Sequence, residues 1–278
     1  MSLLSTSSPV TLSVIVPCYN EEATIDGTLD ALEALEEQLE PSGVALEVIA
    51  VDDCSTDATL VRLRSRATGR EGRLVVVRHD RNRGKGAAIL TARESITGDI
   101  VLIQDADLEY DPTDVPTLIG PILDGRADAV LGTRFGGSGA KRVLYFWHRL
   151  GNGCLTLLSN MFTDLNVTDM ETGYKAFSAE VFRAMRLTNR RFGIEPEMVA
   201  RLSQMGARVY EVPISYHGRT YAEGKKITWR DGLVAIFHIL RARATASSQP
   251  RLAPRRVVRT PAVLKAISSA RHRRAIGA

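Results

Sequence analysis

The stretch IVLIQDADLEYDP, residues 100–112, decides how this chain is expected to fold. It opens with aliphatic residues typical of a buried strand and then carries acids at Asp105, Asp107, Glu109 and Asp111. Side chains two residues apart at the end of a strand point the same way. Asp105 and Asp107 therefore repel each other unless a cation lies between them or one is protonated. Mg²⁺ or Mn²⁺ suits such oxygen ligands.

Strand and helix patterns alternate around this stretch. Apolar runs predict strands, and helical spacing of apolar residues predicts helices between them. The predicted strands are 12–17, 45–53, 73–79 and 99–105, and the predicted helices are 21–40, 57–67 and 84–96. This βαβαβ order is typical of an α/β protein with a doubly wound, parallel sheet.

The second half of the chain is less regular. Its predicted helices are 142–162, 195–206 and 227–242, and its predicted strands are 173–177 and 208–216. Within the first of these helices, Gly151 and Gly153 are expected break points.

Polar motifs follow three of the predicted strands: PCYNEE (17–22), DDCSTD (52–57) and DADLEYD (105–111). Ligands of open α/β sheets bind beyond the carboxyl ends of the strands, so the motifs are expected to form one site. Asp52 and Asp53 stand where an acid commonly accepts hydrogen bonds from a ribose or a base. Asp57 and Ser55 are expected to cap the start of the helix predicted at 57–67.

Some familiar nucleotide and metal loops are excluded. An EF-hand counted from Asp105 has Tyr110 where glycine is obligatory, and HDRNRGKGAA (79–88) has His79 where a P-loop needs its first glycine. No GxGxxG follows the first strand, which disfavours a dehydrogenase. The tripeptide 84–86, Gly-Lys-Gly, either approaches an anion at a helix start or only forms a turn.

Composition separates an acidic body from a basic tail. Residues 241–278 hold ten Lys and Arg and no acid, whereas 1–240 hold 26 Lys and Arg and 32 Asp and Glu. We expect one globular domain over 1–240 and a basic, largely disordered tail over 241–278. We expect a cytoplasmic protein, soluble or peripheral. The sequence shows three widely spaced cysteines, no signal peptide pattern and no apolar run of ~18 residues.

Seven motifs follow one another along the chain: SVIVPCYNEEATI, VDDCSTDAT, NRGKGAAI, DADLEYDP, LGTRF, DMETGYKAF and FGIEPEMVARL. In this order they resemble the motifs of the family 2 inverting glycosyltransferases. Within these the sequence is most similar to the dolichyl- or polyprenyl-phosphate sugar synthases, the relatives of dolichol-phosphate mannosyltransferase. The resemblance runs from about Leu12 to about Leu240. It implies the GT-A fold, a Rossmann-like nucleotide-binding half with a mostly parallel central sheet and helices on both faces, fused to an acceptor half.

The resemblance also implies roles for residues at the strand ends. Asp105 and Asp107 would form the DxD motif that binds Mn²⁺ or Mg²⁺ on the diphosphate of a UDP- or GDP-sugar, with Gln104 close to the metal. The residues implied around the nucleotide are Pro17, Tyr19, Asn20, Glu21, Asp52, Asp53 and Lys85.

Further residues are implied around the transferred group. Arg134 matches a loop arginine over the site and would pair with phosphate. A phosphate acceptor needs no general base; for a hydroxyl acceptor, Asp169 and Glu171 are the candidates, and both could equally position the acceptor or the sugar. Arg219 and Lys225 lie in a glycine-containing basic stretch that is either a closing lid or a solvated loop.

The resemblance implies transfer of a hexose to a polyprenyl or dolichyl phosphate. The alternatives are a soluble sugar or small phosphorylated acceptor, and a non-catalytic nucleotide-sugar-binding protein. The apolar 142–162 segment, the amphipathic 227–242 segment and the basic tail favour an anionic membrane surface, on the inner face of the plasma membrane. No aromatic residues interleave with the charges of the tail, so no specific nucleic acid partner is expected.

Overall fold

The computed structural model describes residues 9–137, 143, 145–191, 193–218, 236–237, 239, 241 and 249–252. Its strands are β1 Val10–Cys18, β2 Val44–Asp52, β3 Leu74–Arg78, β4 Ile100–Ile103, β5 Ala129–Thr133, β6 Lys175–Ser178 and β7 Val209–Pro213. Its α-helices are α1 Ile25–Leu39, α2 Thr59–Ala67, α3 Lys85–Ala92, α4 Val115–Leu123, α5 Phe146–Thr163, α6 Ala179–Ala184 and α7 Ile194–Met205. Short 3₁₀ turns follow α1 and α3 and precede α4.

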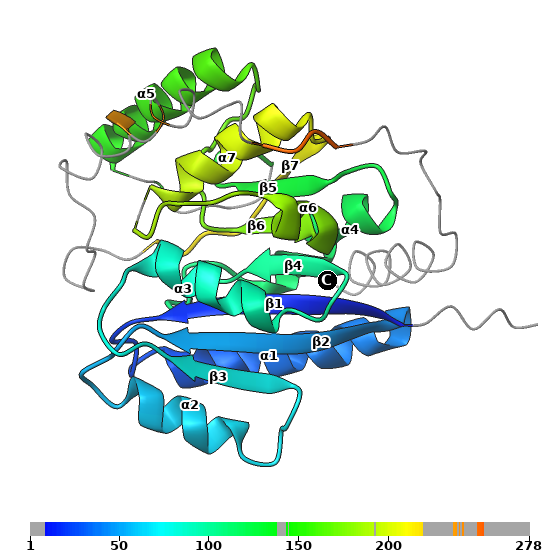
Figure 1. Cartoon of the computed structure of the whole chain (residues 1–278), viewed down its shortest axis with the longest axis vertical. Coiled ribbons are helices and arrows are strands. Elements are labelled where there is room, and N and C mark those ends of the chain that lie inside the picture. The colour runs from blue at the N-terminus through cyan, green and yellow to red at the C-terminus, as the bar shows by residue number, and fades with distance from the viewer. Residues whose placement is uncertain are drawn as a thin grey trace, which may run out of the picture.

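The strands form one central sheet in the order β3-β2-β1-β4-β6-β5-β7 (Figure 1). β6 runs antiparallel to its neighbours β4 and β5, and the other strand pairs are parallel. The predicted α/β class with a mostly parallel sheet is therefore confirmed. The antiparallel insertion of β6 beside β4 joins the two halves of the molecule through backbone hydrogen bonds.

Two apolar layers bury the faces of the sheet. Val14 and Val16 of β1 belong to the cluster that includes side chains of α1 and α4, whereas Ile15 belongs to the cluster of α3, α6 and α7. This alternation follows from the period of two along a strand. Helices thus cover both faces, as Figure 1 shows, and the sheet holds its strand tips in fixed positions.

The predicted elements of the first half are confirmed with small shifts at their ends. The helix predicted at 21–40 begins only at Ile25, because Glu21 to Thr24 form the turn that precedes it. In the second half, α5 runs through Gly151 and Gly153 without a break, so the expected break points are wrong. A glycine costs a helix only about 1 kcal/mol. Most of 227–242 lies outside the described residues.

Part of the predicted tail contacts the body. The backbone N–H of Leu252 donates to the carbonyl of Met205 at 3.0 Å, and Gln249 Oε1 accepts from the backbone N–H of Arg186 at 3.0 Å. The expected disorder therefore does not hold for residues 249–252. The rest of the tail beyond Leu252 lies outside the described residues, and the division at residue 240 stays a prediction.

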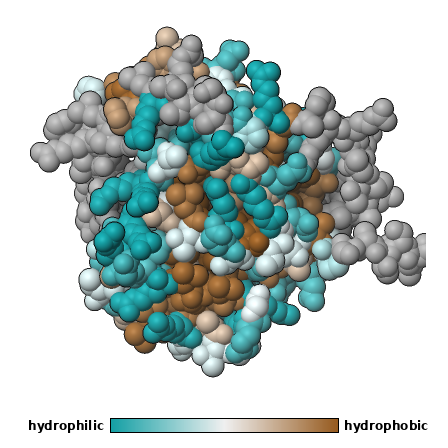
Figure 2. Space-filling view, viewed as in Figure 1, coloured by the Kyte–Doolittle hydropathy of each residue, from teal (hydrophilic) through white to brown (hydrophobic). Residues whose placement is uncertain are grey.

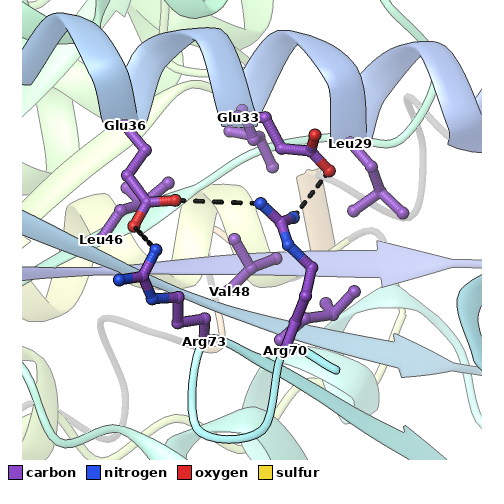
Figure 3. Close-up of a pocket in the computed structure, with 9 residues that line it drawn as sticks. Leu29, Glu33, Glu36, Leu46, Val48, Arg70 and Arg73 are labelled. Atoms are coloured by element: carbon purple, nitrogen blue, oxygen red, sulfur yellow. Dashed lines mark hydrogen bonds and ion pairs between the residues drawn. The ribbon is translucent and has the colours of Figure 1, made fainter. Parts of the chain in front are cut away.

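A shallow surface pocket lies between α1 and the first residues of β2 and β3. Figure 3 shows ion pairs across it, in which Glu33 lies 2.6 Å from Arg70 and Glu36 lies 3.2 Å from Arg73. Exposed ion pairs of this kind contribute about 0–1 kcal/mol each. Because the pocket is lined by the early residues of these strands, it lies away from the carboxyl edge of the sheet.

Across the described ranges, none of the helices combines the length and the apolar character that crossing a bilayer requires.

Candidate active site

The predicted convergence of the strand-end motifs is confirmed. β1 lies between β2 and β4 and is parallel to both, so their carboxyl ends share one edge. The backbone N–H of Asn20 donates to Ser55 Oγ at 3.0 Å, and Asn20 Oδ1 accepts from the N–H of Thr56 at 2.9 Å. The hydroxyl of Thr28 in α1 donates to the carbonyl of Ala106 at 3.0 Å, which connects the third motif to the helix that follows the first.

Each of the three loops contains a non-glycine residue in the left-handed backbone region. These residues are Asn20 (φ 53°), Cys54 (φ 62°) and Leu108 (φ 59°). Such conformations are uncommon for non-glycine residues and persist where surrounding contacts fix them. The backbone at this edge of the sheet is therefore tightly defined.

Asp53 fixes the loop that leads into α3. Its carboxylate accepts from the backbone N–H groups of Arg83 (2.8 Å) and Gly84 (2.7 Å) and lies 2.6 Å from His79 Nδ1. Asp52 is fully buried and accepts a longer bond, 3.3 Å, from the N–H of Ser55. Asp53 is thus engaged within the protein, and of the two acids Asp52 is the better candidate for a nucleoside contact.

The glycines of the 84–86 tripeptide allow close packing of two chain segments. A Cβ on Gly84 would lie 2.5 Å from the carbonyl oxygen of Arg190, and one on Gly86 would lie 2.3 Å from that of Asn189. Gly84 also has a φ of +94°, which disfavours a side chain. Chain packing therefore explains these glycines without a bound anion, and it fixes the position of Lys85 at the first turn of α3.

Lys85 lies at the centre of a group of largely buried charges. Its Nζ lies 2.7 and 3.0 Å from the two carboxylate oxygens of Asp105 and 2.9 Å from Glu195 Oε1. Burial alone would lower the pKa of Lys85, but the carboxylates of Asp105 and Glu195 raise it well above its usual value. Gly173 leaves room for this contact, because a Cβ there would lie 2.4 Å from Asp105 Oδ2.

Two more titratable side chains belong to this group. Burial, followed by the charge of Glu195, raises the pKa of Glu171 to about 7. Lys175 of β6 is fully buried and donates to the carbonyl of Met170 at 3.1 Å. Burial lowers the pKa of Lys175 to about 8. Burial therefore moves the pKa of an acid and that of a base in this site toward neutrality.

Neither Glu195 nor Lys175 is among the site residues predicted from the sequence. Both lie within quoted motifs, FGIEPEMVARL and DMETGYKAF. The available signal was Lys175, a charged residue between Tyr174 and Ala176 in a strand whose described positions are all buried. A buried lysine requires partners, so that pattern indicates nearby carboxylates.

Arg134, just after β5, is held by a bidentate ion pair. Its Nε and one terminal nitrogen lie 2.6 and 2.7 Å from the two oxygens of Asp169, which is fully buried. Asn152 of α5 donates to Asp169 at 3.2 Å. The guanidinium also lies over the ring of Tyr216, 5.1 Å from its centroid. Because Arg134 and Asn152 occupy Asp169, this residue is better suited to positioning Arg134 than to acting as a base.

Some buried oxygen atoms near Asp105 have no partner among the described residues. They are Gln104 Oε1, Glu171 Oε1 and Glu195 Oε2. Buried acceptors are normally satisfied, so these atoms are expected to meet a ligand hydroxyl, a cation or water. The amide nitrogen of Gln104 donates to the carbonyl of Asp105 at 3.1 Å, which fixes the orientation of its side chain.

The donor chemistry fits a hard divalent cation held in part by substrate. Within the described ranges, no three His, Cys, Asp or Glu side chains gather as a complete metal site. The DxD loop offers the carboxylates of Asp105 and Asp107, and Mg²⁺ typically takes one or two carboxylates and completes its shell with phosphate oxygens and water. Since Lys85 already balances the charge of Asp105, Asp107 is the better placed of the two to bind a cation.

The remaining predicted residues lie either at the site or outside the described residues. Pro17 and Tyr19 lie at the end of β1, and the Tyr19 side chain is 39% exposed. Glu21 accepts from the hydroxyl of Thr24 at 3.0 Å and so helps to start α1. Arg219 and Lys225 lie outside the described residues, so the lid assigned to them stays a prediction.

Comparisons with known proteins agree with this architecture. The model of glycosyl transferase family 2 matches residues 13–186. The chain is 32% identical over 222 residues to the low-salt glycan biosynthesis hexosyltransferase Agl6 of Haloferax volcanii, covering 78% of this chain and 51% of the relative. It is 28% identical over 215 residues to a dodecaprenyl-phosphate galacturonate synthase of Rhizobium johnstonii, covering 77% of this chain and 61% of the relative.

The fold also matches a solved structure. Glucosyl-3-phosphoglycerate synthase from Mycobacterium tuberculosis, in complex with Mn²⁺, UDP and phosphoglyceric acid, superimposes with a TM-score of 0.65 at 22% identity. The match covers 92% of this chain and 91% of that one. This likeness confirms the GT-A fold.

The fold and the strand-end site define a GT-A protein, and the family model covers more than half of the chain. The chain belongs to glycosyl transferase family 2. It spans only about half to three fifths of the length of the two relatives above.

Proposed function

We propose that this protein is an inverting, metal-dependent hexosyltransferase that moves a sugar from a UDP- or GDP-sugar to a polyprenyl phosphate. The observation that carries the proposal is the meeting of the acidic DxD residues, Asp52 as the candidate nucleoside contact and the partly buried Arg134 at one edge of the sheet. The relatives support the acceptor, because one is a dodecaprenyl-phosphate galacturonate synthase and another an undecaprenyl-phosphate 4-deoxy-4-formamido-L-arabinose transferase.

A divalent cation belongs to the proposal. Asp107, with Asp105, would hold Mn²⁺ or Mg²⁺, which when bound neutralises the negative charge of the departing diphosphate. Structures of glucosyl-3-phosphoglycerate synthase contain UDP with Mn²⁺ or Mg²⁺, which supports this choice. Lys85 holds the Asp105 carboxylate and supplies positive charge at the same strand tip.

Arg134 is the proposed phosphate-binding group of the acceptor. Its planar guanidinium suits phosphate oxygens, and the Asp169 pair fixes the orientation of its plane. Binding to a phosphate that is already ionised brings a competent nucleophile to the sugar without a proton transfer. Asp169 is then a positioning residue, and Asp169→Asn is expected to lower acceptor binding through Arg134.

Glu171 is proposed to contact the sugar. With a pKa of about 7 it is present in both protonation states at neutral pH, so it can donate to or accept from a sugar hydroxyl. Its Oε1 has no partner among the described residues, which leaves that atom available for such a bond. For a hydroxyl acceptor the same group could take up the proton.

A small phosphorylated acceptor is the second candidate. The similar M. tuberculosis enzyme was crystallised with phosphoglyceric acid and with glucosyl-3-phosphoglycerate. Both acceptor classes carry a phosphate, so Arg134 fits either. With a polyprenyl phosphate acceptor the protein would work peripherally on the inner face of the plasma membrane.

A transfer assay distinguishes the candidates. The full chain is incubated with labelled UDP- or GDP-hexoses and Mn²⁺, with either undecaprenyl phosphate in detergent or 3-phosphoglycerate as acceptor. Label in the lipid fraction supports the proposal, and label in the small phosphorylated product supports the second candidate.

The control is the Asp107→Ala variant. It is expected to abolish transfer to either acceptor while the melting temperature stays close to that of the wild type. Equal transfer by wild type and Asp107→Ala would refute the proposed chemistry.

A further inference from the structure

We propose that the outward face of α5 docks on the surface of an anionic lipid bilayer. We call this face the α5 outer face and define it by the exposed apolar side chains of the helix. They are Phe146 (70% exposed), Trp147 (74%), Leu150 (47%), Leu157 (62%) and Met161 (72%). Tyr145 and Val143, just before the helix, are also exposed.

Helix α5 carries apolar side chains on two sides, because Leu155, Leu158 and Phe162 pack against the core while the α5 outer face is exposed. Its most deeply buried residues, Thr156, Ser159 and Thr163, are polar, so the helix does not keep its apolar side chains for the core. A helix that packs on a protein core normally turns its apolar stripe inward and its polar residues outward. Here a second set of large apolar side chains faces outward, and hydrophobic surface shows over α5 at the upper left of Figure 2. Large exposed apolar patches mark interaction sites.

The positive charge of the segment that contains α5 indicates an anionic partner. Residues 135–163 contain Lys141, Arg142 and Arg149, and no acid. A cationic segment with exposed Trp, Tyr and Phe is the composition that favours the interface of an anionic bilayer.

Charge also disfavours the other occupants. A second copy would bring the same cationic segment against itself, because a two-fold interface pairs identical patches. The C-terminal residues 241–278 carry ten Lys and Arg without an acid, so they offer the face no opposite charge either. An anionic bilayer is the partner whose charge complements that of residues 135–163.

The helix links this face to the site. Asn152, on the same helix, donates to Asp169, which holds Arg134. Docking of the outer face would therefore place the Arg134 pair close to the lipid headgroups. This part of the inference rests on the proposed function, because it gives a lipid-linked phosphate a direct path to Arg134; membrane docking itself does not depend on activity.

Vesicle binding of the full chain tests the inference. Sedimentation is measured with vesicles of phosphatidylcholine alone and of phosphatidylcholine mixed with phosphatidylglycerol. We expect binding to the anionic vesicles only, and we expect the double variant Phe146→Ser/Met161→Ser to lower the partition coefficient about tenfold or more. Both side chains are mostly exposed, so the variant is expected to fold. Val61→Ser, which changes a 69% exposed apolar residue of α2, is the matched control and should bind as the wild type.

Tryptophan fluorescence gives a second readout. The chain has two tryptophans, so Trp229→Phe leaves Trp147 as the only indole. Its emission is expected to shift to shorter wavelength with anionic vesicles and to be quenched by brominated lipids.

Three outcomes would overturn the inference: no binding by the wild type, binding that the double variant retains, or a concentration-dependent dimer that the double variant abolishes. Hydrolysis of the nucleotide sugar in solution, measured in parallel, tests the proposed function separately. The double variant should leave that hydrolysis unchanged.

Discussion

Replacing Gly173 with alanine should displace the DxD carboxylate without altering any charge. A Cβ at this position would lie 2.4 Å from Asp105 Oδ2, 3.2 Å from Lys85 Nζ and 3.2 Å from a ring carbon of Tyr110. Ordinary van der Waals contact begins near 3.4 Å, so the Asp105 oxygen must move by about 1 Å. The Lys85 ion pair at 2.7 Å opposes that movement.

The expected cost appears in both activity and stability. A displacement of about 1 Å at a reacting centre can cost on the order of 10²-fold in rate. Overpacking of a buried site costs about 1–3 kcal/mol of unfolding free energy. The backbone of Gly173 does not have a positive φ, so alanine introduces no backbone strain, and the effect is steric.

The assay is sugar transfer under saturating donor, together with thermal unfolding. Gly120→Ala in α4 is the matched control, because a Cβ there meets no atom within 4 Å. It should leave the transfer rate unchanged and stabilise the fold by about 0.4–1 kcal/mol. Wild-type transfer by Gly173→Ala would refute the reasoning that the position of Asp105 controls the reaction.

The remaining predictions concern two buried carboxylates. Glu171 has a pKa of about 7 in the folded protein, compared with a usual value of 4.5, so the folded state binds this proton more tightly than the unfolded state does. The stability that this proton contributes is therefore lost as the pH rises from about 4.5 to about 7. In urea unfolding, Glu171→Gln should therefore be more stable than the wild type at pH 8, by up to roughly 3 kcal/mol, and similar to the wild type near pH 5. The control Glu37→Gln, which changes an exposed residue, should show no such difference between the two pH values. Asp53→Asn should lose the bonds that start α3 and lower the unfolding free energy by about 2–3 kcal/mol, whereas Asp80→Asn, which removes an exposed ion pair, should change it by less than about 1 kcal/mol. Equal melting temperatures for these two aspartate variants would contradict the role assigned to Asp53.

The strand tips could be predicted from sequence because their signal is local. The apolar run of β4 and the acids after it are contiguous, and the parallel βαβ pattern places the ends of β1, β2 and β4 together. Helix ends were also predictable where a residue type fixes them, as at Gly206, which ends α7 with a φ of 67°.

Contacts between distant segments could not be predicted in this way. Asp53 receives its backbone partners from about 30 residues further along the chain, so its structural role is invisible to local pattern. The antiparallel placement of β6 between β4 and β5 depends on long-range pairing. Periodicity identified α5 as a helix, but it could not show which of its apolar residues pack on the core, as Leu155 and Phe162 do, and which stay exposed, as Trp147 does.

Calorimetric titration of UDP and GDP into the protein, with and without Mn²⁺, tests the central claim most directly. We predict that the wild type binds one of these nucleotides in a Mn²⁺-dependent manner and that Asp107→Ala binds it equally weakly whether or not Mn²⁺ is present. Mn²⁺-dependent binding of undiminished affinity in Asp107→Ala would contradict the claim that the cation and the diphosphate meet at the tip of β4.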